Sequence, residues 1–532
     1  MITQLRPFEC TQFYMTLTWL LVVGSMLVFS LAGRNENPNC IEKERQALLS
    51  FKHGIIDTQN SLSSWNSEDG NCCRWVGISC DNETGYVVTL DLGCTLFCNH
   101  LLAGELSPSL HELSYLSHLD LSGNNFTANI IFINELGNLS NLKYLDLSSN
   151  AQLKVESLEW VSGLSSLTYL GMNNLDLSSI AADWVESIKK LPMLQNLHLS
   201  HCAISEPFLS CLPNLQVLGL SHNFLTLSLS SDWVPPFHLK VMKLSSCNLG
   251  PNFPTWLHTH MDFEYLDISC NGIRDFIPDW FWDLSDQLRY LNLSYNSLSG
   301  TLPNTTLHLE HNCQIDLSYN EFAGEFYHYI LSTEDNEYKF EVDYRDGAWF
   351  ALKGVKAKYG NILALLKLID LSANQLTGQI PEGLTSLYEL VSLNLSRNHF
   401  SGNIPEKIGQ LTQLNSLDLS NNHLSGRIPI SLANISFLEY LDLSNNELCG
   451  AIPKGTQLQS FDASKYAGNP QLCGLPTLNM CPGDEILPRS PGTQGNNKHD
   501  HWKENMGFYI SLIFGFIIGF WGVCWTLLLP SS

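Results

Sequence analysis

Residues 438–453 read LEYLDLSNNELCGAIP, and this stretch decides the fold. Its framework is Leu438-x-x-Leu441-x-Leu443-x-x-Asn446, closed by an Ile-Pro pair. The same framework begins at regular intervals of 24 residues upstream, at Leu366, Leu390 and Leu414. Four copies in register predict a repeat architecture, in which each copy is one structural unit.

Looser copies precede these four and bring the total to fourteen. They begin at Val87, Leu116, Leu142, Leu167, Leu194, Leu215, Leu239, Phe263, Leu288 and Asn312. Each Leu-x-Leu piece predicts a short strand with both leucines buried, and the Asn turns the chain against the next coil. One coil cannot bury its leucines alone, whereas stacked coils can. The pattern is that of leucine-rich repeats and predicts an α/β solenoid, a right-handed curved superhelix with a parallel sheet on its concave face.

One interval breaks the period. From Asn312 to Leu366 is 54 residues, which is 30 more than the 24-residue repeat. We interpret residues 326–361 as an island that leaves the solenoid, between repeats 1–10 in residues 85–325 and repeats 11–14 in residues 362–460. Long insertions of this kind are usually functional or disordered.

Two apolar segments predict a secreted and membrane-anchored topology. Residues 1–32 read as a signal peptide that ends in a small-x-small pattern, with an uncleaved anchor as the alternative. Residues 506–529 carry no formal charge and are long enough for one transmembrane helix. An acidic and polar juxtamembrane spacer, residues 483–505, precedes the helix, and only residues 530–532 follow it as a vestigial cytoplasmic tail. The prediction is a single-pass type I protein of the plasma membrane with its ectodomain outside the cell.

Charge and cysteine content narrow the partners and the compartment. The net charge of −24 argues against a nucleic-acid partner, because phosphate binding needs clustered cations. Sixteen cysteines favour an oxidising compartment. Cys40, Cys72, Cys73 and Cys80 fall in a predicted N-terminal cap, residues 33–84, and Cys473 and Cys481 fall in a C-terminal cap, residues 461–482. Pairs Cys40–Cys72 and Cys73–Cys80 fit the spacing, although sequence alone leaves other pairings open.

Both ends of the chain resemble one family. Two stretches resemble the plant leucine-rich-repeat N-terminal cap. They are Cys40-x-x-x-Glu44-Arg45-x-Ala47-Leu48-Leu49-x-Phe51-Lys52 and Cys72-Cys73-x-Trp75-x-Gly77-Ile78-x-Cys80. The Leu-Ser-Gly-x-Ile-Pro half-repeat is of the plant type, which implies a plant-type convex side. Three further segments are similar to receptor-like proteins of the ethylene-inducing-xylanase receptor type. They are Gly250-Pro251-x-Phe253-Pro254-x-Trp256-Leu257, the Gly468-Asn469-x-x-Leu472-Cys473-Gly474 cap and the start of the predicted membrane helix at Gly507.

The resemblance implies a receptor for a microbial or endogenous ligand, with defence as its setting. Such proteins lack a kinase and signal through partner receptor-like kinases, so the implied contacts are the ectodomain and the transmembrane helix. The ligand would be an extracellular protein, peptide or glycan. Members of this subgroup usually carry more repeats and a short basic tail, so this chain departs from them at both points.

The residue between the two strand leucines points into the concave groove. In eight of the fourteen repeats it is Asp, and the bland interpretation is that Leu-Asp-Leu-Ser belongs to the repeat itself. Four consecutive repeats, from Gly171 to Lys243, carry no acid there. A neutral-to-basic window in an acidic groove would attract an acidic or polar ligand face. Its predicted ligand contacts are His198, His201, His222, Lys240 and Lys243, and the island of residues 326–361 is the alternative location for the contacts.

Other candidate sites concern modification and the membrane. Asn-x-Ser/Thr sites, which mark glycosylation of a secreted protein, occur at Asn82, Asn125, Asn138, Asn292, Asn304, Asn394 and Asn434. Gly507, Ser511, Gly515 and Gly519 share one face of the predicted membrane helix and would let another helix approach closely. His198, His201 and Cys202 could suggest a metal, but Cys202 occupies the Asn position of its repeat, where a structural thiol is expected.

Two other classes of function compete with a receptor. A secreted or wall-associated inhibitor or decoy, similar to polygalacturonase-inhibiting proteins, would share the cap and the repeats but lack the island and the anchor. An enzyme is the third class, but the sequence carries no phosphate loop, kinase set, Gly-x-Ser-x-Gly or His-Glu-x-x-His. We therefore expect no catalytic site, no cofactor and no metal.

Overall fold

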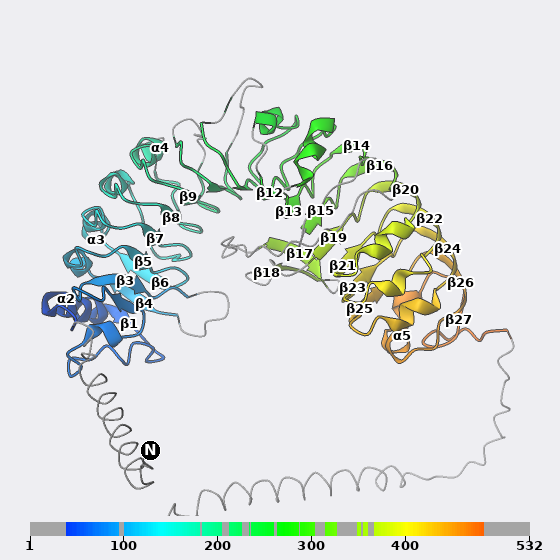
Figure 1. Ribbon diagram of the computed structural model, residues 1–532, viewed down its shortest axis with the longest axis horizontal. Coiled ribbons are helices and arrows are strands. Elements are labelled where there is room, and N and C mark those ends of the chain that lie inside the picture. The colour runs from blue at the N-terminus through cyan, green and yellow to red at the C-terminus, as the bar shows by residue number, and fades with distance from the viewer. Residues whose placement is uncertain are drawn as a thin grey trace, which may run out of the picture. The chain divides into compact units, whose positions relative to one another are not determined.

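The structure is a computed structural model that describes the repeat region almost throughout (Figure 1). It describes residues 39–94, 101–180, 183–204, 212–225, 234, 236–259, 263–286, 288–303, 314–326, 348–352, 355–359 and 367–482. The predicted signal peptide, spacer, membrane helix and tail, together with Asn304 and most of the island, lie outside these residues. Among the helices in these ranges, none has the length and apolar character needed to cross a membrane.

A sheet of fifteen strands runs through the described repeats, and its strands follow chain order. They are β2 (Ile78–Cys80), β3 (Val87–Asp91), β5 (His118–Asp120), β7 (Tyr144–Asp146), β8 (Tyr169–Gly171), β9 (Asn196–His198), β10 (Val217–Gly219), β11 (Val241–Lys243), β12 (Tyr265–Asp267), β13 (Tyr290–Asn292), β15 (Gln314–Asp316), β19 (Lys367–Asp370), β21 (Leu390–Asn394), β23 (Ser416–Asp418) and β25 (Tyr440–Asp442). Only β2 is antiparallel to its neighbour, and the other fourteen strands, one per predicted repeat, are parallel. In Figure 1 the coils follow an arc, with this sheet on the inner side.

The leucine pattern explains both the core and the register. Leu119, Leu145 and Leu170 are direct partners in adjacent strands, and each is fully buried. Where a coil has the repeat Asn, that residue closes the turn, as Asn150 does by donating to the carbonyl oxygens of Leu121 at 2.9 Å and Leu147 at 3.0 Å. Each coil is therefore held to the previous one by backbone, amide and apolar contacts together.

Two smaller sheets are formed by strands outside the inner sheet. One of seven strands comprises β14 (Ser299–Thr301), β16 (Glu321–Glu325), β20 (Gln375–Gln379), β22 (His399–Asn403), β24 (His423–Arg427), β26 (Glu447–Ala451) and β27 (Gln471–Cys473). A smaller one comprises β1 (Ile55–Ile56), β4 (Ala103–Leu106) and β6 (Asn125–Ala128), in which β1 is antiparallel. Short 3₁₀ turns and the helices α3 (Ile130–Leu136), α4 (Asp183–Ile188) and α5 (Thr456–Ser460) complete the coils.

The ladder passes over the irregular interval. β15 pairs directly with β19, and β16 pairs with β20, although residues 327–366 lie between them in sequence. Within that interval β17 (Ala348–Leu352) and β18 (Val355–Tyr359) form an antiparallel hairpin of their own. The inner sheet is therefore continuous across the interval.

The N-terminal cap seals the first coil. Its helix α2 (Glu42–His53) places Glu44 at 2% exposure, where the carboxylate accepts a hydrogen bond of 2.7 Å from the Val87 backbone N–H. Trp65 and Trp75 stack with their ring centroids 5.5 Å apart. Both predicted pairings, Cys40–Cys72 and Cys73–Cys80, are present as disulfide bonds. At the other end Cys473 and Cys481 are both disulfide-bonded, and so is Cys94 in the first coil.

Candidate ligand-binding surface

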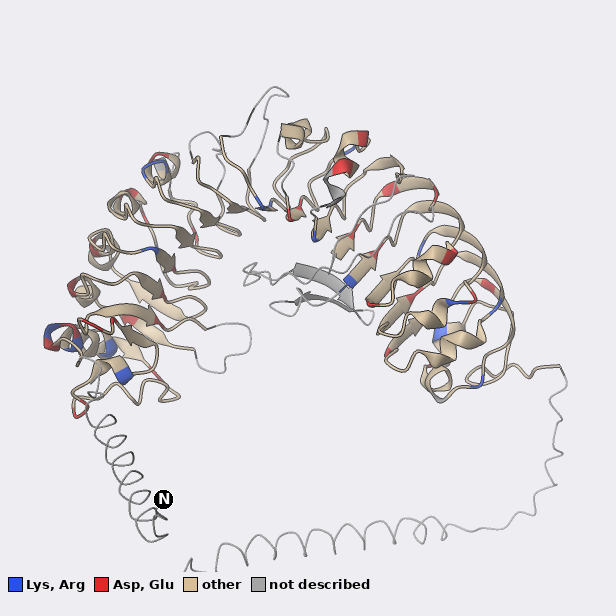
Figure 2. Ribbon diagram, in the orientation of Figure 1, with Lys and Arg blue, Asp and Glu red and all other residues tan. Residues whose placement is uncertain are grey.

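The aspartates between the two strand leucines, which we call the acidic column, have a structural role in the inner sheet. Figure 2 shows acidic positions recurring along the inner strands. Asp120, Asp146, Asp316 and Asp370 are each no more than 7% exposed. Each accepts a backbone N–H from the serine two residues later, as Asp370 does from Ser372 at 2.9 Å. These carboxylates therefore close a local turn in the coils that carry them.

Burial also changes the protonation of this column. It raises the pKa of Asp146 to about 6, with the nearby Asp120 carboxylate as a further cause. It raises the pKa of Asp267 to about 6 and that of Asp370 to about 7, and the Asp316 carboxylate adds to both shifts. These three carboxyl groups therefore keep their protons to a higher pH than exposed aspartates do.

A row of stacked rings lies beside the acids. Tyr144 stacks on Tyr169 with ring centroids 4.2 Å apart, and His118 stacks on the other side of Tyr144 at 4.1 Å. Tyr265 and Tyr290 form a second pair at 3.9 Å. The rings bind to one another along the sheet, so they are structural and do not form a ligand cage.

Two of the five predicted window residues are not surface residues. His198 is 2% exposed and its ring packs 5.1 Å from that of Tyr169, whereas Lys243 is 6% exposed and its ammonium lies 5.2 Å from the Tyr265 ring centroid. This corrects the prediction that both are open to a ligand. The sequence could not show it, because the side chains that cover them come from adjacent coils.

The gap in the acidic column has a packing cause. A Cβ at Gly171 would lie 2.6 Å from a carboxylate oxygen of Asp146, and one at Gly219 would lie 3.3 Å from His198 Nδ1. The glycines therefore leave room for larger neighbours. This observation gives a packing reason for the missing acids at Gly171 and Gly219, two of the four positions in the gap.

The other three window residues are exposed along the two margins of the sheet. His201 and His222 follow β9 and β10, and their rings stack at 4.1 Å. Lys240 precedes β11 and pairs with Glu264 at 3.3 Å. The exposed members of the window are thus the imidazole groups of His201 and His222 and the ammonium group of Lys240, beside the ends of β9–β11.

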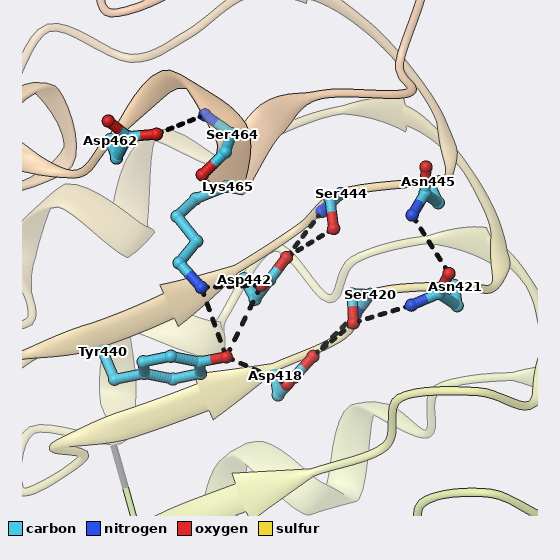
Figure 3. Close-up of polar contacts among 10 residues, drawn as sticks. All are labelled: Asp418, Ser420, Asn421, Tyr440, Asp442, Ser444, Asn445, Asp462, Ser464 and Lys465. Carbon is cyan, nitrogen blue, oxygen red and sulfur yellow. Dashed lines mark hydrogen bonds and ion pairs between the residues drawn. The ribbon is translucent and has the colours of Figure 1, made fainter. Parts of the chain in front are cut away.

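Sequence reasoning missed the residue that ends the acidic column. Lys465 follows the last strand of the sheet, and its ammonium lies 2.9 Å from Asp442 Oδ2 and 4.5 Å from the Tyr440 ring centroid (Figure 3). The Tyr440 hydroxyl donates to Asp418 Oδ2 at 3.3 Å. The coil of Lys465 could have been found in the sequence from Asn469. This residue occupies the same turn position as the repeat asparagines and donates to the Leu443 carbonyl at 2.9 Å.

The cysteines in the window have a structural environment. The Cys202 thiol donates to the Met172 carbonyl at 3.0 Å, and the Cys247 thiol donates to the Leu220 carbonyl at 3.1 Å. Burial raises the pKa of both thiols to about 12, so both stay protonated. Within the described residues, the one cluster with metal-ligand spacing is Cys40, Cys72 and Cys73, all of which are in disulfide bonds.

The predicted glycosylation sites divide into two groups. Asn82, Asn125, Asn138 and Asn434 are exposed. Asn292 is 4% exposed, and its amide donates to the Tyr290 hydroxyl at 3.3 Å. Asn394 is half-buried, and its amide donates to Asp370 Oδ2 at 3.0 Å. The last two side chains are used by the inner sheet, which argues against the predicted glycans at these positions.

Family models match several parts of the chain. The model described as leucine rich repeat N-terminal domain matches residues 41–81. Two leucine rich repeat models match residues 264–322 and residues 115–139, 365–387, 389–411, 413–435 and 437–457. These matches fall on the cap and on the coils described above.

Known proteins with similar sequences are receptor-like. The chain is 32% identical over 347 residues to receptor-like protein EIX1 of Solanum lycopersicum, covering 58% of this chain and 28% of that protein. It is 32% identical over 355 residues to receptor-like protein EIX2 of the same plant, covering 54% and 34%. The chain therefore spans about a third of the length of these relatives. A solved structure of a TDR receptor is 26% identical with a TM-score of 0.50, covering 70% of this chain and 66% of that chain.

Proposed function

Because this leucine-rich-repeat chain resembles plant receptor-like proteins of the EIX type, we propose that it recognises an extracellular ligand at the cell surface. The proposal is carried by one observation: the likeness to both EIX proteins extends over more than half of this chain. The sealed N-terminal cap and the continuous inner sheet supply a rigid scaffold for binding residues at its margins. The chain would act by recognition, without catalysis of its own.

Signalling would then require a partner. We propose that residues 506–529 anchor the chain in the plasma membrane, in a single-pass type I topology, and contact a receptor kinase through Gly507, Ser511, Gly515 and Gly519. Small residues at intervals of four allow two helix backbones to approach closely. The sequence of this segment supports the proposal, and so do the receptor-like relatives.

The test is co-purification from plant membranes. We compare the native chain with a Gly515→Leu, Gly519→Leu variant and with a matched Ile513→Leu, Ile517→Leu control on the opposite helix face. We expect a receptor kinase to accompany the native chain and the control, and at least tenfold less kinase to accompany the glycine variant. Absence of a kinase from all three would contradict the receptor proposal and favour a wall-associated inhibitor or decoy.

The proposed ligand surface includes the exposed part of the predicted window. His201, His222 and Lys240 lie at the two margins of the sheet over β9–β11, and a protein, peptide or glycan could contact both margins at once. A defence role is part of this proposal, and its support is the likeness to EIX1 and EIX2.

A further inference from the structure

The two disulfide bonds of the N-terminal cap differ in exposure. Cys40 and Cys72 are 7% and 0% exposed, and we call the bond between them the buried bond. Cys73 and Cys80 are half-buried, and we call the bond between them the accessible bond. A soluble thiol reaches the accessible bond more readily, because thiol–disulfide exchange requires access to a sulfur atom.

The two bonds lie close together in the cap. The sulfur atoms of Cys40, Cys72 and Cys73 all lie within 4.8 Å of one another. The approach of Cys73 to Cys72 follows from their adjacency in the sequence, but Cys40 belongs to the segment before α2. The fold therefore places one sulfur of the accessible bond beside both sulfurs of the buried bond.

One side chain holds this arrangement. The Asn71 side-chain oxygen Oδ1 accepts the Cys40 N–H at 3.1 Å and the Cys73 N–H at 3.2 Å. Two donors on one oxygen keep the Cys40 and Cys73 backbones together without the help of either disulfide bond. Opening the accessible bond therefore leaves Cys73 beside Cys40.

The covalent geometry also selects the sulfur that a free Cys73 thiolate attacks. Attack on Cys72 would join consecutive residues, whose Cα atoms are about 3.8 Å apart, below the range of about 4.4–6.8 Å in ordinary disulfide bonds. Attack on Cys40 joins two residues whose backbones share the Asn71 oxygen. A bond between Cys40 and Cys73 is therefore the favoured product, with Cys72 as the leaving thiol.

We propose that the N-terminal cap is a thiol–disulfide exchange site, in which reduction of the accessible bond by a soluble dithiol is passed on to the buried bond. The dithiol is oxidised to a disulfide, and Cys73 and Cys80 each gain one electron and one proton. The Cys73 thiolate then attacks the Cys40 sulfur and forms a new bond with it. The buried bond breaks, its electron pair goes to the Cys72 sulfur, and that sulfur takes up the proton that Cys73 lost.

Exchange changes the access to the bond that holds Cys40. Before exchange this bond is buried, and after exchange it contains the half-buried Cys73, so that a second dithiol can reduce it. The strand β2, which ends at Cys80, loses its covalent link in the first step, and the segment before α2 loses its link in the last. The cap therefore opens in a fixed order, and this inference does not depend on the proposed ligand or partner.

The sharpest test uses two single variants of the full chain in detergent. Cys80→Ser leaves Cys73 as a free thiol, and Cys73→Ser leaves Cys80 as one. Each variant is held at mildly alkaline pH, where thiolate forms, and is then alkylated and mapped by mass spectrometry. Cys80→Ser should contain the Cys40–Cys73 bond together with alkylated Cys72. Cys73→Ser is the matched control and should keep the buried bond, because the Cys80 sulfur lies outside the set of three neighbouring sulfurs.

A second measurement needs no variant. One equivalent of dithiothreitol, added to the native chain, should produce the same Cys40–Cys73 bond, with alkylated Cys72 and Cys80. The double variant Cys73→Ser, Cys80→Ser should lose its buried bond to excess dithiothreitol about tenfold more slowly than the native chain does, because only direct attack on buried sulfurs remains. An intact buried bond in both Cys80→Ser and the partly reduced native chain would overturn the proposal. Rearrangement in Cys73→Ser as extensive as in Cys80→Ser would overturn it as well.

Discussion

At the residue scale, a side chain in this solenoid is defined by its column and by the coils on either side. Asn292 and Asn434 carry the same sequence signal for glycosylation, yet their environments differ. The side-chain oxygen Oδ1 of Asn292 accepts the Ser294 N–H at 3.0 Å and the Ser294 hydroxyl at 2.7 Å, while Asn434 is exposed. A motif of three residues does not distinguish these environments, because burial of Asn292 depends on neighbouring strands.

This contrast predicts a glycan map. Glycopeptide mass spectrometry of the secreted, folded chain should find glycans at Asn82, Asn125, Asn138 and Asn434 and none at Asn292, where a sugar on the amide would displace the inner-sheet hydrogen bonds. Asn434→Gln should remove one glycan, and Asn292→Gln should remove none. A glycan at Asn292 on natively folded protein would show that the inner sheet is more open than described.

At the element scale, the repeat asparagines link adjacent coils, and we call them the asparagine ladder. The strongest test of this ladder is at Asn374, in the first coil after the insertion. Asn374 donates to the carbonyl oxygens of Leu317 at 3.0 Å and Leu371 at 3.1 Å, and it accepts the Phe322 N–H at 3.1 Å. All these contacts are buried. Asn374→Ala should therefore destabilise the chain by about 2–4 kcal/mol, because it leaves buried backbone groups unpaired.

The matched variant uses a residue that the chain already places in this ladder. Cys247 keeps one thiol hydrogen bond to the Leu220 carbonyl at 3.1 Å, so Asn374→Cys should cost less than Asn374→Ala. Urea unfolding of the full chain, followed by tryptophan fluorescence, measures the difference. Equal losses in both variants would mean that the volume of the side chain matters more than its hydrogen bonds.

The same elements show how much of the fold could be predicted from the sequence. The period of 24 residues located the parallel strands, because Leu441 and its equivalents must all point into one core. The two N-terminal disulfide bonds are pairings that the cap cysteines allowed, although their spacing alone left other pairings open. The coil of Lys465 was missed, because it lacks the strand leucines and keeps only Asn469 of the repeat framework.

The candidate site was less predictable. Exposure of His198 and Lys243 is determined by rings on adjacent coils, and the positions of Tyr169 and Tyr265 relative to them depend on register between coils. The hydrogen bond of 3.0 Å between Arg397 and the Tyr319 hydroxyl joins coils on the two sides of the insertion, because β15 pairs directly with β19. Such contacts between coils are not visible in any single repeat.

At the scale of the whole molecule, the buried carboxylates couple the stability of the solenoid to pH. Burial raises the folded-state pKa of Asp146 and Asp267 to about 6 and that of Asp370 to about 7, above the ordinary value of 3.8. A raised pKa of an acid means that the folded chain binds protons more tightly than the unfolded chain. The stabilisation is therefore complete below about pH 4 and is lost as pH rises through 6 to 7.

Lowering the pH from 8 to 5 should thus raise the free energy of unfolding by about 3–5 kcal/mol. Hydrogen bonds from Arg45 and Gln46 lower the pKa of Glu42 to about 2. The contribution of Glu42 to stability has the opposite pH dependence, and it is lost only at more acidic pH. Asp370→Asn should reduce the pH dependence and be no less stable than the native chain at pH 8, since the amide oxygen can still accept the Ser372 N–H. Asp91→Asn, the same substitution at an exposed position of the column, is the matched control. Urea unfolding at four pH values measures these slopes, and a native chain that is more stable at pH 8 than at pH 5 would show that the column is ionised and solvated in the fold.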